Sequence, residues 1–363
     1  MKVCIIGDGL VSLTLANVLI QKELEVDILI TKKNNQYDKS RTLGIAKNNI
    51  DYFNNEIINL DKILWKINKI KIYTEKNSSK EILKFDNNKK QIFSIVRNYD
   101  LKKLLHDKLK RSKFVKFKNI VSYQDIIKQK YKLIINNSPN HQISKLFFYK
   151  KIEKNYNSYA YTTTINHKKV IDNNTAFQNF TNNGPIAFLP ISETQTSVVY
   201  SLRAKNKINS SDLKNLIKKY NPIYSITKIN DCSCFELRSS NLRKYYKNNI
   251  LAFGDLLHKI HPLAGQGFNM SLRDIKLLSD LIDEKINLGL DIDDTICHEF
   301  QKNSQDKNYL FSTGIDWIYE LFNFESRVNS NLLNNSISII GKNKIMNSLF
   351  KKLADGGLRI KNY

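Results

Sequence analysis

The sequence lacks several features that would place it in a class at once. Four cysteines are present, Cys4, Cys232, Cys234 and Cys297, and the single Cys-x-Cys pair has no second pair at a zinc-binding spacing. We therefore expect reduced thiols and no metal site. No apolar run approaches the roughly 18 residues of a membrane-spanning helix. The N-terminus runs directly into a glycine motif, which is not the pattern of a signal peptide. These absences favour a soluble or peripheral protein.

Acidic residues are few relative to basic ones, and the formal net charge is +24. Two interpretations stay open. Lys, Asn and Ile are abundant throughout, as an A/T-rich gene would dictate, so the charge can be a compositional bias on a solvated surface. The alternative is attraction to anionic lipid head groups or nucleic acid. A nucleic-acid binder predicts a basic run, and the lysines are spread along the chain. We therefore expect no nucleic-acid partner.

The composition and the first 30 residues predict an α/β protein of about two domains. Apolar residues make up 41% of the 363 residues, enough for a core. Residues 3–6 read as a buried strand, 10–21 as an amphipathic helix and 26–30 as a second strand. This βαβ unit is typical of a doubly wound, Rossmann-like sheet.

The sequence pattern changes after residue 155, from segments typical of a βαβ unit to short β-rich segments. Short β-rich segments at 160–165, 176–181, 186–191 and 197–202 predict an antiparallel sheet inserted into the first domain. Residues 70–74 and 82–85 predict a hairpin around 76–79. The chain returns to the first domain at 245–283. After about residue 291 the pattern is helical, with Trp317, Ile318, Leu321 and Phe322 on one apolar face.

Gly7-x-Gly9-x-x-Ser12 follows the first strand and opens the first helix, which is the context of a dinucleotide fingerprint. The first glycine makes the turn, the second lets the backbone approach a pyrophosphate, and Ser12 keeps helix and strand close. The acidic residue expected after the second strand, for the adenosine ribose, is absent. Thr31 stands there and can hydrogen-bond a ribose hydroxyl.

A second glycine motif occupies residues 250–269. An apolar strand ends in Gly254-Asp255, a turn containing Pro262 follows, and a helix is expected to start near Gly267. This geometry aims free backbone N–H groups at one point in space. Asp255 can accept hydrogen bonds from ligand hydroxyls. A reduced flavin with its ribityl chain fits both demands.

These residues carry a resemblance to the ubiquinone-biosynthesis hydroxylase family of class A FAD-dependent aromatic monooxygenases, which share the p-hydroxybenzoate hydroxylase-like fold. The second motif of that family is matched by Gly254-Asp255-x-x-His258-x-x-His261-Pro262-x-Ala264-Gly265-Gln266-Gly267-x-Asn269 and the following Arg273-Asp274. Further matches lie at 41–43, 96–98, 159–160 and 176–190.

The resemblance implies roles for named residues. Around the flavin ring it implies a catalytic environment made by Pro262, Gly265, Gln266 and Gly267. It implies cofactor binding by Gly7, Gly9, Ser12, Thr31, Arg41, Arg97, Gly254, Asp255, Gly265, Gly267, Phe268 and Asn269. His258 is expected to be structural, His261 is open between a structural and a chemical role, and His167 is expected to face solvent.

Two departures from the family pattern stand out. Leu256 and Leu257 replace two alanines and are expected to affect packing beside the cofactor. The family's middle Asp-Gly motif is expected after the strand ending at Ile135, where this chain has Asn136-Asn137-Ser138-Pro139. The electron donor is therefore open: NAD(P)H or another reductant.

The resemblance implies a fold and an activity. A Rossmann-like FAD-binding domain is expected over 1–60, 91–150 and 245–290, a β-sheet substrate domain over 61–90 and 151–244, and a helical C-terminal region over 291–363. The expected reaction is hydroxylation of the ring of a polyprenylated phenol in ubiquinone biosynthesis, with FAD and O2, through a flavin hydroperoxide.

Two further expectations concern partners and catalysis. The expected location is cytoplasmic, with peripheral contact to the inner face of the cytoplasmic membrane through the C-terminal helices, including 345–353, and contact with other ubiquinone-biosynthesis proteins. The alternative function is a non-catalytic member of a ubiquinone-biosynthesis assembly that keeps the fold.

Overall fold

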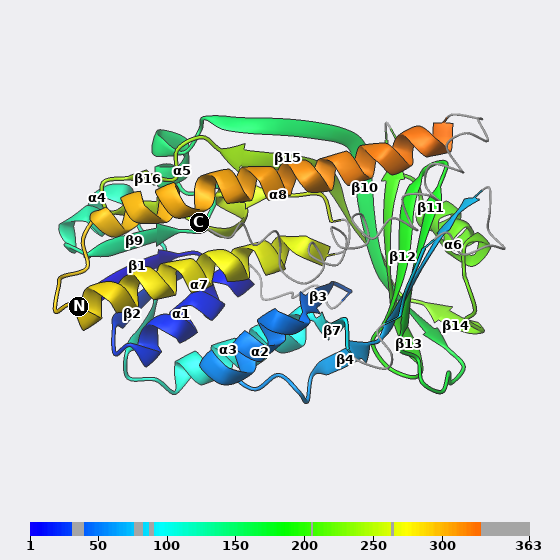
Figure 1. The fold of residues 1–363 in the computed structure, drawn as a ribbon, viewed down its shortest axis with the longest axis horizontal. Coiled ribbons are helices and arrows are strands. Elements are labelled where there is room, and N and C mark those ends of the chain that lie inside the picture. Colours follow the sequence, from blue (N-terminus) through cyan, green and yellow to red (C-terminus); the bar gives the residue numbers. More distant parts are fainter. Residues whose placement is uncertain (31–39, 76–82, 87–90, 205, 263–264, 328–363) are drawn as a thin grey trace.

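The computed structural model describes residues 1–30, 40–75, 83–86, 91–204, 206–262 and 265–327. The chain forms two β-rich halves, and Figure 1 shows that the long strand β10 (Lys151–His167) and the long helix α8 (Thr295–Arg327) run along both. The predicted fold class, a doubly wound α/β domain with an inserted β-sheet and a helical C-terminal region, is confirmed.

The first sheet is the doubly wound one. Its order is β16 (Tyr246–Lys247), β17 (Ile250–Ala252), β9 (Leu133–Asn136), β1 (Lys2–Ile6), β2 (Glu25–Ile30) and β8 (Val115–Asn119). All neighbours pair in parallel except β16 with β17. Val3 to Ile6 are fully buried, which is why this strand reads as a continuous apolar run.

Six of the described helices accompany this sheet in the first half of the molecule. They are α1 (Leu10–Gln21), α2 (Lys47–Glu56), α3 (Asn98–Lys110), α4 (Tyr123–Lys128), α5 (Gln142–Phe147) and α7 (Gln266–Asn287). Helix α1 packs against both α3 and α7. The expected βαβ unit is present as β1, α1 and β2.

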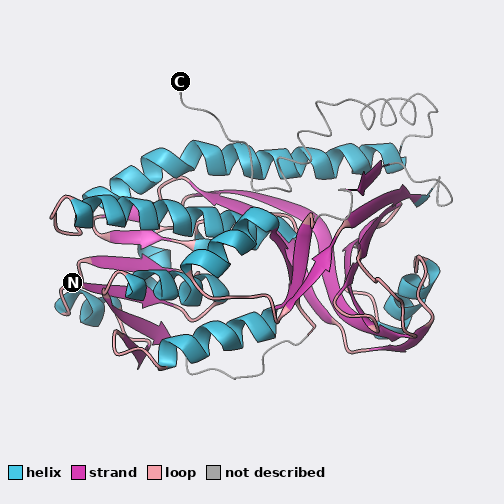
Figure 2. Cartoon of the chain, turned by 60° about the horizontal axis from the view of Figure 1, so that its bottom comes forward, coloured by secondary structure: helices cyan, strands magenta, loops and turns pink. Residues whose placement is uncertain are grey.

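The second sheet is large and mixed (Figure 2). Its order is β18 (His258–Lys259), β15 (Ser233–Leu242), β10, β13 (Gln195–Arg203), β12 (Gly184–Pro190), β11 (Thr175–Thr181), β5 (Lys69–Thr74) and β6 (Leu83–Asp86), with β14 (Ile226–Ile229) paired to β10. The expected antiparallel pairing needs one correction, because β11 pairs in parallel with β5. Strand β5 precedes β11 by about 100 residues in the sequence, so no hairpin connects the two strands.

A small antiparallel sheet connects the two halves. It contains β3 (Thr42–Ala46), β7 (Phe93–Arg97) and β4 (Leu64–Ile67). Each half has its own apolar core: α1 and the first sheet form one, and helix α6 (Ser210–Lys219) packs on the second sheet to form the other. The predicted domain boundaries themselves stay a prediction.

Two expectations about individual side chains need comment. His167 was expected to face solvent, and this is wrong: it is 4% exposed, and its Nε2 lies 3.0 Å from the Thr196 hydroxyl. Its ring also packs on that of Tyr224, which lies just before β14, the strand that pairs with the end of β10. Trp317, expected on the apolar face of the last helix, is 73% exposed. The expected turn at 76–79 lies outside the described residues.

We predict that Gly184→Ala destabilises the second sheet by more than about 2 kcal/mol. Gly184 has φ +123°, and a Cβ there would lie 2.0 Å from the carbonyl oxygen of Ser201. The control is Gly314→Ala in α8, where a Cβ meets nothing within 4 Å. Ala is the better helix former, so this control is expected to be neutral or stabilising. Urea unfolding midpoints measure both, and an unchanged midpoint for Gly184→Ala contradicts the prediction.

Candidate functional site

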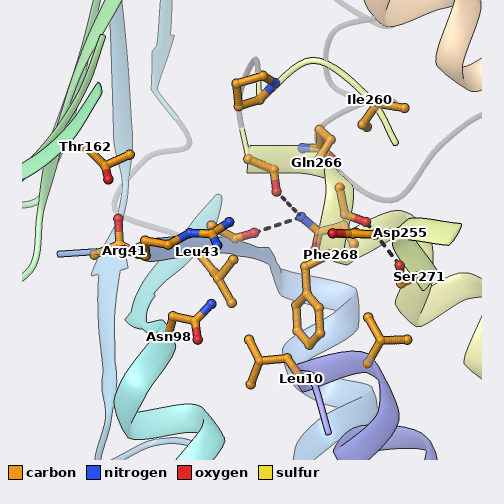
Figure 3. A pocket seen from close by; sticks show the side chains of 18 of the residues that line it. Leu10, Arg41, Leu43, Asn98, Thr162, Asp255, Ile260, Gln266, Phe268 and Ser271 are labelled. Carbon is orange, nitrogen blue, oxygen red and sulfur yellow. Dashed lines mark hydrogen bonds between the residues drawn. The ribbon is translucent and has the colours of Figure 1, made fainter. Parts of the chain in front are cut away.

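One cavity of about 1050 Å³ lies where the two halves meet. It is at the upper end of the range for ligand pockets, about 300–1,000 Å³. Figure 3 shows that its walls come from distant parts of the chain: Arg41 and Leu43 at β3, Asn98 on α3, Thr162 on the second sheet, and Asp255, Gln266 and Phe268 from the second glycine motif. The sequence alone therefore does not reveal the cavity, but its motifs supply most of the walls.

The first glycine motif forms one end of this cavity. Gly7 has φ +106°, and a Cβ on Gly9 would meet nothing within 4 Å, so the backbone here is open to a ligand. Helix α1 begins after Gly9 without a side-chain cap, which leaves its first amides free to bind an anion. The Ser12 hydroxyl is fully buried and makes no hydrogen bond within the described residues. These features fit a pyrophosphate.

The second glycine motif forms the facing wall. Gly254 has φ +59°, and a Cβ there would lie 2.7 Å from the Asn137 side-chain oxygen. Asp255 follows it and lines the cavity. Gly265, at φ +65°, precedes α7, which also has no side-chain cap. The backbone of the first turn, at Gln266, Gly267 and Phe268, borders the cavity, and the N-terminal end of the α7 dipole favours negative charge there.

Asn269 fixes the position of this helix entrance. Its side-chain amide donates to the Gly44 carbonyl oxygen at 2.8 Å, and its side-chain oxygen accepts from the Ala46 N–H at 3.0 Å and from the Asn49 side-chain amide at 2.8 Å. The residue is 1% exposed. Asn269 was predicted to bind the cofactor, and in the structure it lines the cavity while it ties α7 to β3.

The two arginines predicted at the cofactor lie in different places. Arg41 lines the cavity, and its guanidinium stacks over Phe235 at 5.4 Å. Arg97 is not among the lining residues: it donates to the Gln195 side-chain oxygen and lies 3.9 Å from Asp100. Thr31 and Ala264 lie outside the described residues, and Pro262 is on the cavity wall.

The two histidines of the second motif are both buried and contact other protein side chains. His258 is buried and makes a short hydrogen bond to Asp274, whose other oxygen accepts from Asn308 at 3.0 Å. His261 is 1% exposed and packs between the rings of Tyr156 and Tyr319. Burial lowers the pKa of His261 to about 3, so its imidazole is neutral near pH 7.

The two departures from the family pattern have definite positions. Leu256 and Leu257 are buried in the first core and do not line the cavity, so they do not block it. Asn136 stabilises the turn after β9, because its oxygen accepts from the Ser138 N–H at 3.0 Å. Asn137 lines the cavity next to Gly7, and its amide is buried without a hydrogen bond in the described part of the chain.

The far part of the cavity is apolar. Side chains from the second and third sheets line it: Ile70, Phe93, Ile95, Ala176, Leu189, Val199, Phe235 and Leu237. Over the whole cavity, the charged lining comprises five Lys or Arg residues and two Asp residues. Among the described residues no cluster of three metal-binding side chains exists. The cavity therefore suits an anionic cofactor with an apolar substrate, and no metal centre is seen in that part.

Several lining residues were not singled out from the sequence. Lys102, His106 and Lys110 of α3, with Phe117 of β8, border the cavity. We call the end of the cavity next to the first glycine motif, where Lys102 lies 3.2 Å from Asp8, the nucleotide end. The three α3 residues are spaced four apart in the sequence, but this spacing indicates a binding face only when the structure shows which side of the helix faces the cavity.

Comparisons with known proteins relate the chain to FAD-binding proteins. Residues 151–287 match the family described as FAD binding domain. The chain is 25% identical over 213 residues to the ubiquinone biosynthesis monooxygenase COQ6 of Xenopus tropicalis, covering 47% of this chain and 46% of that protein. It is 29% identical over 154 residues to the 3-demethoxyubiquinol 3-hydroxylase of Escherichia coli, covering 40% and 39%. The matches thus span less than half of these relatives.

Solved structures show the same fold over nearly the whole chain. The p-nitrophenol 4-monooxygenase PnpA of Pseudomonas putida superimposes with a TM-score of 0.75 at 11% identity, covering 99% of this chain and 98% of that one. Klebsiella pneumoniae HpxO, solved with FAD and uric acid, gives 0.74 at 12% identity, covering 98% and 97%. The predicted resemblance and the FAD cofactor are confirmed: the chain has the fold of these monooxygenases, residues 151–287 match the FAD binding domain family, and under half of the chain is similar in sequence to the two ubiquinone-biosynthesis enzymes named above.

Proposed function

We propose that this protein is an FAD-dependent monooxygenase that hydroxylates the aromatic ring of a polyprenylated phenol in ubiquinone biosynthesis. One observation carries the proposal. A single cavity joins two uncapped helix entrances, which suit a dinucleotide, to an apolar wall, which suits a prenylated ring. The relatives named above, both from ubiquinone biosynthesis, support the substrate class.

The residues of this chain position and shield the reaction. The amides at the start of α7 would stabilise negative charge that develops on the flavin ring during reduction. Asp255 would accept hydrogen bonds from the ribityl hydroxyls. When bound, FAD supplies the redox chemistry that transfers one oxygen atom from O2 to the substrate. The flavin hydroperoxide route stays a prediction.

The substrate itself reduces the demand for acid–base residues. A phenol is an electron-rich ring, so it activates itself toward an electrophilic oxygen. This agrees with the structure, in which His258 is occupied by Asp274 and His261 is buried between two tyrosine rings. The apolar wall would exclude water and hold the prenyl chain.

We also propose peripheral contact with the inner face of the cytoplasmic membrane and with other ubiquinone-biosynthesis proteins, in a cytoplasmic protein. The exposed Trp317 on α8 supports an interfacial contact, since Trp prefers the boundary between water and lipid. In the part of the chain that the structure describes, the helices are too short or too polar to cross a bilayer. NAD(P)H or another donor would reduce the flavin.

The activity is tested with the purified protein reconstituted with FAD. We expect the absorbance spectrum of a bound flavin and, with a chemical or enzymatic reductant and O2, a product of a short-chain prenylphenol heavier by one oxygen atom in mass spectrometry. Bound flavin without hydroxylated product contradicts the proposed reaction. No bound flavin after reconstitution supports the alternative, a non-catalytic member of a ubiquinone-biosynthesis assembly.

We predict that Gly265→Ala weakens FAD binding at least about tenfold, equivalent to roughly 1.4 kcal/mol. A Cβ there would lie 3.2 Å from the Gly44 backbone nitrogen, and the alanine would have to keep the left-handed backbone conformation of Gly265. We therefore expect the start of α7 to shift. Gly289→Ala is the matched control, because Gly289 follows the other end of α7 at φ +68° with nothing within 4 Å of a Cβ. Both variants carry backbone strain, but only the first should lose FAD affinity in a fluorescence titration. Equal FAD affinities would contradict the prediction.

A further inference from the structure

One face of helix α3 borders the nucleotide end of the cavity. Asn98, Lys102, His106 and Lys110 follow one another at intervals of four residues, and all four line the cavity. Such a spacing puts side chains on one face of a helix. From the first to the last of them the helix rises about 18 Å. The cavity therefore has a polar stripe along its length, which we call the α3 stripe.

The α3 stripe contacts β8, the neighbour of the strand that is not followed by a ribose-binding carboxylate. Ile30 ends β2 without an acid and lines the cavity. Phe117 lies on β8, the strand paired with β2. Its ring contacts the His106 ring at 5.0 Å between centroids, and both line the cavity. An aromatic pair next to the end of β2 offers a stacking surface for a base.

Lys102 lies closer to the glycine turn. Its amino group is 3.2 Å from the carboxylate of Asp8, the residue between Gly7 and Gly9. The side chain of Lys102 is 18% exposed, so its charge is held at the cavity by partial burial. A lysine next to a glycine turn and an uncapped helix start is in position to face a pyrophosphate.

His106 has the chemistry that the missing carboxylate would have provided. Burial and the neighbouring Lys110 and Lys102 lower the pKa of its imidazole, which Asp107 and Asp8 only partly oppose. The ring is therefore neutral near pH 7. A neutral imidazole has one nitrogen that accepts a hydrogen bond, so it can take a ribose hydroxyl as a carboxylate does.

We propose that the α3 stripe binds the adenosine diphosphate half of FAD in this protein, with Lys102 at the pyrophosphate and His106 with Phe117 at the adenosine. In this way residues of α3 and β8 replace the acidic residue that is absent after β2. The inference rests on the proposed function only in requiring FAD as the cofactor, and it is independent of the reaction and its substrate.

The experiment compares two flavins that differ in the adenosine diphosphate half. The apoprotein is titrated with FAD and with riboflavin, which lacks both phosphates and the adenosine, and quenching of flavin fluorescence gives each Kd. We expect the wild type to bind FAD more tightly than riboflavin. His106→Ala and Lys102→Ala should each raise the Kd for FAD about tenfold, as expected for the loss of a hydrogen bond to a polar or charged ligand, and leave the Kd for riboflavin unchanged.

Lys103→Ala is the matched control. Lys103 is the next residue of α3, is exposed and does not line the cavity. The Lys103→Ala substitution removes one positive charge from the same helix, as Lys102→Ala does. If the loss of a charge on α3 weakened FAD binding in a general way, Lys103→Ala would also raise the Kd for FAD. Its Kd values for both flavins should equal those of the wild type. Thermal unfolding of all variants shows whether the fold is kept.

Three outcomes would overturn the inference. They are an unchanged Kd for FAD in both stripe variants, an equal loss of affinity for FAD and riboflavin, and a wild type that binds the two flavins equally. A protein that binds FAD as expected but does not hydroxylate a prenylphenol would contradict the proposed function and leave the inference in place. The two failures are therefore distinguishable.

Discussion

The site depends on one close approach between two backbones, that of Gly265 before α7 and that of Gly44 in β3. A side chain at Gly265 would come within 3.2 Å of the Gly44 nitrogen, and the backbone there is left-handed, so glycine is the residue that fits. Asn269 holds the same contact from one turn further on, through hydrogen bonds to Gly44 and Ala46. This junction places the start of α7 at the same cavity as Arg41 and the glycine turn after β1.

The electrostatic character of the cavity follows from the same arrangement. Two helices begin at its walls without side-chain caps, and basic side chains outnumber acidic ones along its lining. Both effects favour a ligand with negative charge. The second sheet adds an apolar wall a short distance away. A surface that favours negative charge and an apolar surface are thus brought to one cavity by two halves that each have their own core.

Local patterns predicted the parts of the fold that local physics controls. The apolar run at 3–6, the glycines at 7 and 9 and the helical periodicity after them gave β1, α1 and their connection. The second glycine motif gave the start of α7 to within one residue. The parallel pairing of β11 with β5 was not predictable in this way, because strands more than 90 residues apart meet without a connecting signal.

The sequence by itself determined the two glycine-lined helix entrances and the family resemblance, because backbone conformations that favour glycine are recorded in residue types at fixed spacing. Only the tertiary structure decided which side chains face the cavity. It directs Arg97 to Gln195, buries His167 against Tyr224 and presents the α3 stripe to the cavity. The reason is that a helix face or a strand face acquires a partner only through long-range packing, and four-residue spacing alone does not tell a solvated face from a binding face.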